Sequence, residues 1–154
     1  MIDKFDKKIL AALQSNSNIS NLELSEKILL STSATLRRVQ ILEQKGVIQG
    51  YTALLNKSVL DADVQVVLRV TLDSQEGYKL DEFEHQIAKI PNVLSCYLIG
   101  GDYDYLLHIA VKNIKDYEKL HKSALSKLPH VYRLQSNFAL KEVVRRINPI
   151  IDIN

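Results

Sequence analysis

The chain has 154 residues, of which 25% are charged and 46% hydrophobic, and its formal net charge is +2. This composition is typical of globular proteins and excludes a disordered or fibrous chain. Apolar runs stay short of the roughly 20 residues that cross a bilayer, and the charged start is unlike a signal peptide, so we expect a cytoplasmic protein. Cys96 is the only cysteine. An internal disulfide and a cysteine-rich zinc site are therefore excluded, and we expect Cys96 to be a buried packing residue.

Three helices are predicted in the first 50 residues. The first spans residues 3–15, with apolar side chains at helical spacing and an aspartate placed to cap it. The second, 20–28, opens with a serine–glutamate capping box. The third, 31–45, opens with a capping serine, and Gly46 suits the left-handed position that ends it.

The pattern then changes, and we divide the chain there. The first domain covers residues 1–50, which hold seven Lys and Arg against five Asp and Glu, whereas the remainder holds thirteen of each. An extended linker covers 51–63. The second domain covers 64–154. The basic excess of the first domain is small and supports nucleic-acid binding only weakly.

The second domain alternates between strand and helix periodicity in the order β-α-β-β-α-β. The predicted segments are strand 65–72, helix 80–90, strands 93–99 and 105–111, helix 117–128 and strand 131–144. This order predicts an α+β, ferredoxin-like fold, in which both helices cover one face of an antiparallel sheet. A second copy of the sheet is the simplest cover for the other face, so we expect a dimer.

The third helix carries polar side chains on one face, at i, i+4, i+7 and i+11: Ser33, Arg37, Gln40 and Gln44. The opposite face, with Thr35, Leu36, Val39 and Leu42, is expected to pack. Arg can pair with guanine and Gln with adenine in a major groove. In an isolated helix such residues would usually form a solvated face. Here a capped short helix, a turn and a second capped helix favour a winged or plain helix-turn-helix.

Three further residues near the start of this helix are candidates for DNA contacts. Ser31 and Thr32 lie where exposed N–H groups favour a phosphate. Arg38 lies nearer the packed side, so a DNA-backbone or structural contact is expected there.

Four stretches cover almost the whole chain: IDKFDKKILAALQSNSNISNLELSEKILLSTSATLRRVQILEQKGVIQGYTALLN, IPNVLSCYLIGGDYDYLLHIAV, KDYEKL and LPHVYRLQSNFALKEVV. In this order they resemble the Lrp/AsnC family of transcriptional regulators. The resemblance implies a helix-turn-helix domain and a ligand-sensing domain that regulate amino-acid metabolism. It also implies dimers that assemble into tetramers, octamers or larger rings.

The resemblance further implies an amino acid bound between subunits, near the loop after the second strand. On this sequence the loop residues are Gly100, Gly101, Asp102, Tyr103 and Asp104, and the last strand would contribute Gln135, Ser136 and Asn137. The glycines would let backbone N–H groups approach a carboxylate, and Asp102 or Asp104 would pair with an ammonium. We expect Asp104→Ala to abolish the effector response without unfolding the protein. The alternative is an ordinary tight hairpin turn.

Two positions depart from the family pattern. A small residue and a later glycine are usual in the second helix and its turn, where this chain has Ser25 and Leu29. Leucine adopts positive φ less readily than glycine, so the turn is expected to be reshaped or strained.

The sequence predicts a sequence-specific, nucleoid-associated regulator that binds an imperfect palindrome in double-stranded DNA. The alternative is an effector-independent architectural DNA-binding protein. The four histidines are scattered, and no catalytic, phosphate-binding or metal-binding motif is present, so we expect no enzyme, metal site or cofactor. The effector and operator are left open.

Overall fold

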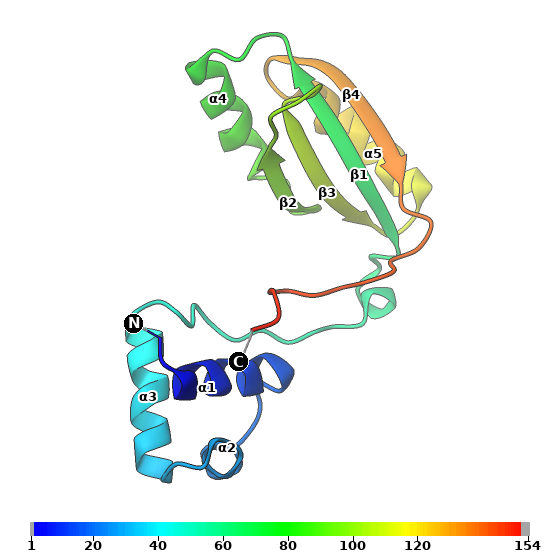
Figure 1. Cartoon of the computed structure of the whole chain (residues 1–154). Coiled ribbons are helices and arrows are strands. Elements are labelled where there is room, and N and C mark those ends of the chain that lie inside the picture. Colours follow the sequence, from blue (N-terminus) through cyan, green and yellow to red (C-terminus); the bar gives the residue numbers. More distant parts are fainter. Residues whose placement is uncertain (1, 152–154) are drawn as a thin grey trace. The chain divides into compact units, whose positions relative to one another are not determined.

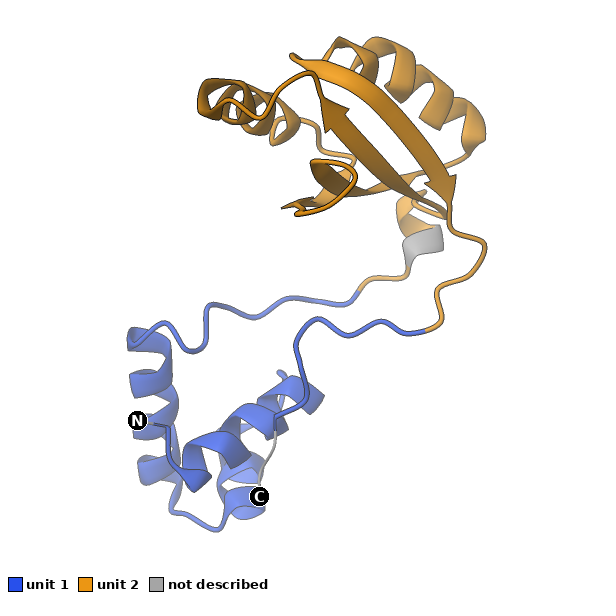
Figure 2. Ribbon diagram, turned by 45° about the horizontal axis from the view of Figure 1, so that its top comes forward, with its two compact units in different colours: residues 1–54, 144–154 blue, residues 55–143 orange. Residues whose placement is uncertain are grey.

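The computed structural model describes residues 2–151, except the side chains of residues 57 and 58. It divides into two compact units, shown in Figure 2: residues 1–54 with 144–154, and residues 55–143. The division falls within the predicted linker. The end of the chain, however, groups with the N-terminal helices, where Gln14 Nε2 donates to the carbonyl of Pro149 at 2.8 Å.

The described part of the first unit contains the three predicted helices: α1 (Lys4–Ser15), α2 (Asn21–Ile28) and α3 (Thr32–Gln44). All three N-caps are as predicted, because Asp3, Ser20 and Ser31 each accept a backbone N–H with the side chain. Five buried residues form the core: Ile9, Leu24, Ile28, Val39 and Leu42. Residues 47–56 form no strand, so these described residues contain no wing.

The turn between α2 and α3 keeps a left-handed residue although no glycine is present. Leu29 has φ 59° and ψ 48°, and it remains 82% exposed. A left-handed conformation costs an L-residue roughly 1–2 kcal/mol, and so exposed a side chain recovers little of that by packing. Ser25 is buried and its Oγ donates to the carbonyl of Leu22 at 2.7 Å. The predicted strain is therefore present in this turn.

The second unit holds a four-stranded antiparallel sheet in the order β2-β3-β1-β4 (Figure 1). Its elements are β1 (Val64–Leu72), α4 (Gly77–Ile87), β2 (Val93–Leu98), β3 (Tyr105–Val111), α5 (Ile114–Ser123) and β4 (Val131–Phe138), with short 3₁₀ helices η1 (Lys57–Leu60) and η2 (Leu125–Lys127). Phe83 of α4 and Tyr117 of α5 enter the same buried cluster as Leu68 and Leu107. Both helices therefore cover one face, as predicted.

Two predicted elements were too long. The helix expected to reach Leu128 ends at Ser123 and gives way to η2. Pro129 favours an extended conformation in the residue before it, and Leu128 has φ −61° and ψ 139°. The strand expected to reach Val144 ends at Phe138, because its partner β1 begins at Val64 and Phe138 already pairs with Val66.

The other face of the sheet carries no helix. Residues paired in register share a face, so the open face consists of Gln65, Val67, Arg69, Thr71, Ser95, Tyr97, Leu106, His108, Ala110, Arg133, Gln135 and Asn137. We call this set the open face. None of the helices in the described part of the chain has the length and apolar character needed to cross a bilayer.

Candidate functional site

The predicted DNA-reading face of α3 is exposed. Thr35, Val39 and Leu42 are buried, which turns the other side of the helix to solvent. The exposed polar residues are Ser33, Arg37, Gln40 and Gln44. Arg37 makes no hydrogen bond or ion pair with the described residues, so its guanidinium is available to an external partner. Leu36, expected to pack, is 39% exposed.

The start of α3 is capped by Ser31 and contacts α2 through Thr32. Ser31 Oγ accepts from the amide of Ala34 at 3.3 Å, and Thr32 Oγ1 lies 3.3 Å from Ser25 Oγ. The first turn of a helix has four amides without a helical acceptor, and the cap satisfies one. The remaining amides, with the helix dipole, suit a phosphate oxygen.

Arg38 makes a structural contact, which is one of the two contacts expected for it. Its Nη1 lies 2.7 Å from both Asp3 Oδ2 and Asp6 Oδ1, and its guanidinium lies 5.5 Å from the Phe5 ring centroid. These bonds raise the pKa of Arg38, Asp6 contributing most. The pKa of Asp3 is lowered, first by the amide of Asp6 and then by Arg38. Arg38 therefore joins the middle of α3 to the start of α1.

The predicted effector loop is wider than a tight turn. The amide of Ile99 donates to the carbonyl of Asp104 at 2.8 Å, and the amide of Asp104 donates to the carbonyl of Val70 at 2.9 Å. Between these anchors, the amides of residues 100–103 make no backbone hydrogen bond within the described part of the chain. The loop thus presents amides that a carboxylate can use.

The Asp104 carboxylate belongs to the fold, which differs from the role predicted for it. Asp104 is only 4% exposed. Its Oδ2 accepts from the amide of Leu72 at 2.7 Å, and its Oδ1 accepts from Gln75 Nε2 at 2.6 Å. Both oxygens therefore hold the end of β1 and the start of the next connection against the loop. Removing this carboxylate would damage the sheet unit itself.

The predicted contribution of β4 divides between the two faces of the sheet. Ser136 pairs with Leu68 in the core register, and its Oγ lies 2.6 Å from the Tyr117 hydroxyl. This contact places Ser136 on the helix side of the sheet, away from the open face. Gln135 and Asn137 lie on the open face.

Arg69 was missed by the sequence analysis. It lies on the open face beside Gln135, and its guanidinium carbon is 5.1 Å from the centroid of the Tyr103 ring. Arg69 thus neighbours both Tyr103 of the loop and Gln135 of β4. The signal was present, because Arg69 is the one charged residue in the strand VQVVLRVTL.

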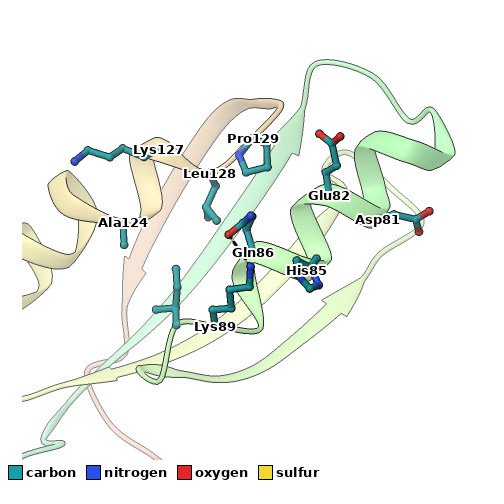
Figure 3. A pocket seen from close by; sticks show the side chains of 10 residues that line it. Asp81, Glu82, His85, Gln86, Lys89, Ala124, Lys127, Leu128 and Pro129 are labelled. Atoms are coloured by element: carbon teal, nitrogen blue, oxygen red, sulfur yellow. Dashed lines mark hydrogen bonds between the residues drawn. The ribbon is translucent and has the colours of Figure 1, made fainter.

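One groove of the second unit lies elsewhere (Figure 3). It has a volume of about 790 Å³ and runs between α4 and the segment joining α5 to β4. Two of its polar groups already have protein partners: Lys89 Nζ donates to Gln86 Oε1 at 3.4 Å, and Glu82 Oε2 lies 2.6 Å from His130 Nε2. None of the predicted effector residues lines it. Residues 2–151 also contain no group of three or more acidic, histidine or cysteine side chains placed to hold a metal ion.

The fold and the exposed face of α3 define a helix-turn-helix DNA-binding protein that carries an additional α+β domain. Two family models match the chain: "Winged helix-turn-helix DNA-binding" over residues 2–49 and "Lrp/AsnC ligand binding domain" over residues 65–149. The chain belongs to the Lrp/AsnC family of transcriptional regulators.

Relatives that match nearly the whole chain support this family membership. The leucine-responsive regulatory protein of Escherichia coli is 39% identical over 92% of this chain and 87% of its own length. The Bkd operon transcriptional regulator of Pseudomonas aeruginosa is 39% identical over 96% of this chain and 97% of its own length. The structure of a Neisseria meningitidis transcriptional regulator in complex with L-Met has a TM-score of 0.90 and 34% identity, covering 96% of this chain and 95% of that one. The protein is thus a DNA-binding regulator with a ligand-binding domain.

Proposed function

We propose that the protein reads a specific operator, an imperfect palindrome, with the α3 helices of a dimer. The exposed polar face of α3 carries this proposal, because Arg37 has no partner among the described residues and lies one turn from Gln40. Arg37 is assigned to a guanine, with Gln40 and Gln44 available to adenine. Ser31, Thr32 and Ser33 lie at the phosphate-facing start of the helix.

The DNA proposal is tested by comparing Arg37→Ala with Lys115→Ala, which removes the same charge from the sheet unit. The probes are an operator selected from random duplexes by the wild-type protein and an unrelated duplex. Arg37→Ala should weaken operator binding by about 1–3 kcal/mol and leave the unrelated duplex nearly unaffected. Equal weakening on both duplexes would make Arg37 a phosphate contact.

We further propose that an amino acid, bound between subunits at the loop of residues 100–103 and the open face near Gln135, controls the protein. Support comes from the unbonded loop amides and from the L-Met complex of the Neisseria relative. A ligand that binds one assembly more tightly increases the population of that assembly. The number of DNA half-sites engaged would change with it.

The effector proposal is tested by a thermal-shift screen of the full chain against the twenty amino acids. A ligand at 100 times its dissociation constant stabilises the folded state by roughly 2.7 kcal/mol. A response to one or a few amino acids is expected. No response to any of them would favour the effector-independent architectural protein, with the helix-turn-helix function retained.

A further inference from the structure

Arg69 lies in the middle of β1, in the row of the open face that also contains Leu106 and Gln135. Leu106 pairs with it from β3, and Gln135 pairs with it from β4. The alternation of β1 buries Leu68 and Val70 on the other side and leaves Arg69 exposed. In the single chain its guanidinium thus lies on the sheet surface, and the residues paired with it, Leu106 and Gln135, are uncharged.

Tyr103 covers this guanidinium from the effector loop. The guanidinium carbon lies 5.1 Å from the Tyr103 ring centroid, within the range of a cation–π contact. Such a contact uses the face of the guanidinium and leaves the N–H groups at its edge free for an acceptor. No hydrogen bond or ion pair joins Arg69 to the residues that the structure describes.

Arg133 brings a second positive charge to the same area. It pairs with Thr71, two residues before Gln135 on β4, and is therefore a diagonal neighbour of Arg69. Diagonal neighbours in a sheet are roughly 7–8 Å apart, within reach of long side chains. The twelve residues of the open face include no aspartate or glutamate. Two arginines at diagonal positions, without an acidic residue on that face, give this area a positive potential that favours an anion.

We propose that Arg69 binds the carboxylate of the effector, with Arg133 adding positive potential and Gln135 donating from its amide. The inference rests on the proposed amino-acid response and adds the group that recognises the ligand. A planar carboxylate accepts two parallel hydrogen bonds from a guanidinium edge, and the amides of residues 100–103 lie beside Tyr103 in the same loop. The site therefore requires a carboxylate. A 2-oxo acid keeps that group, whereas an amino-acid amide loses it.

The test compares matched probes on the full-length chain by isothermal titration calorimetry. The probes are L-leucine and L-methionine, their amides, and the corresponding 2-oxo acids. The variants are Arg69→Gln and Arg69→Lys, with Lys119→Gln on α5 as the charge-matched control. The key readout is the ratio of the dissociation constants for the amide and the free acid, since a general loss of stability would not change this ratio selectively.

For the wild type and Lys119→Gln we expect the amides to bind at least 10-fold more weakly than the acids. Arg69→Gln should weaken binding of the acids about 10- to 100-fold and bring the ratio of the amide and acid dissociation constants close to one. Arg69→Lys should give values between those of the wild type and Arg69→Gln. An unchanged ratio in Arg69→Gln would overturn the assignment of Arg69 while leaving the amino-acid response intact. So would a variant that only changes the oligomeric state in sedimentation, because Arg69 would then face a second copy. Failure of the wild type to bind L-leucine, L-methionine or any of their analogues would overturn this inference, whereas the effector proposal itself is decided by the thermal-shift screen of all twenty amino acids.

Discussion

At Leu29 we expect glycine to be more stabilising than alanine, which is the opposite of their order inside a helix. It is left-handed at φ 59° and 82% exposed, so replacing it removes little packing. Leu29→Ala keeps the Cβ atom and its cost of roughly 1–2 kcal/mol, whereas Leu29→Gly relieves that cost. Glycine loses about 0.5–1 kcal/mol more backbone entropy on folding than alanine. The free energy of unfolding of Leu29→Gly should therefore be about 0.5–1 kcal/mol higher than that of Leu29→Ala.

The assay is urea and thermal unfolding of the full chain, followed by far-UV circular dichroism. For a unit of this size, the difference corresponds to roughly 2–8 °C in Tm. Gln40, exposed in the middle of α3, is the control position, because there glycine should be about 1 kcal/mol less stable than alanine. If glycine were also the less stable variant at Leu29, the left-handed turn would not be a source of strain and the reasoning would fail.

Three other predictions concern contacts within one unit or the other. Asp104→Asn should destabilise the sheet unit by about 1–3 kcal/mol in urea unfolding, since one of its two acceptor oxygens becomes a donor; unchanged stability would return Asp104 to the ligand. Ser136→Ala should leave the affinity for L-leucine and L-methionine unchanged, because its Oγ contacts Tyr117, and a large loss would contradict its placement on the helix side of the sheet. The pKa of Asp3 is lowered in the folded protein, so the stability it contributes is complete above its unfolded pKa of about 4 and is lost as pH falls through the folded value. Unfolding measured from pH 7 to pH 2 should therefore lose less stability in Asp3→Asn, which keeps a capping acceptor, than in the wild type, and identical profiles would refute this role.

The elements that local chemistry determines were predictable. Asp3, Ser20 and Ser31 cap helices whose first amides lie only two or three residues away, so a short window of sequence contains the whole interaction. The strands around Leu68 and Leu107 followed from alternation alone, because one face of each is buried.

The functional assignments were less predictable, since they depend on contacts between distant segments. Arg38 meets its acidic partners across the interface of α1 and α3, and no local pattern reveals that pairing. Ser136 is different, because alternation with the inward-facing Leu134 already indicated the helix side. The same alternation places its neighbour Gln135 on the opposite face of the sheet. Both residues were assigned to the effector site because the family resemblance indicates a stretch of the last strand, and consecutive residues of a strand lie on alternate faces.

The structure separates what holds the effector loop from what is left for a ligand. Asp104 uses both carboxylate oxygens on Leu72 and Gln75, and its backbone closes the loop at Ile99. A ligand at the proposed site would then use the groups that this frame leaves unbonded, namely the loop amides, the guanidinium beside Tyr103 and the β4 side chains of the open face. An alanine scan of the loop would report loss of function at Asp104 and at a true ligand contact alike. Only a change in discrimination between ligands that differ by one group separates the two, because damage to the frame weakens every ligand together.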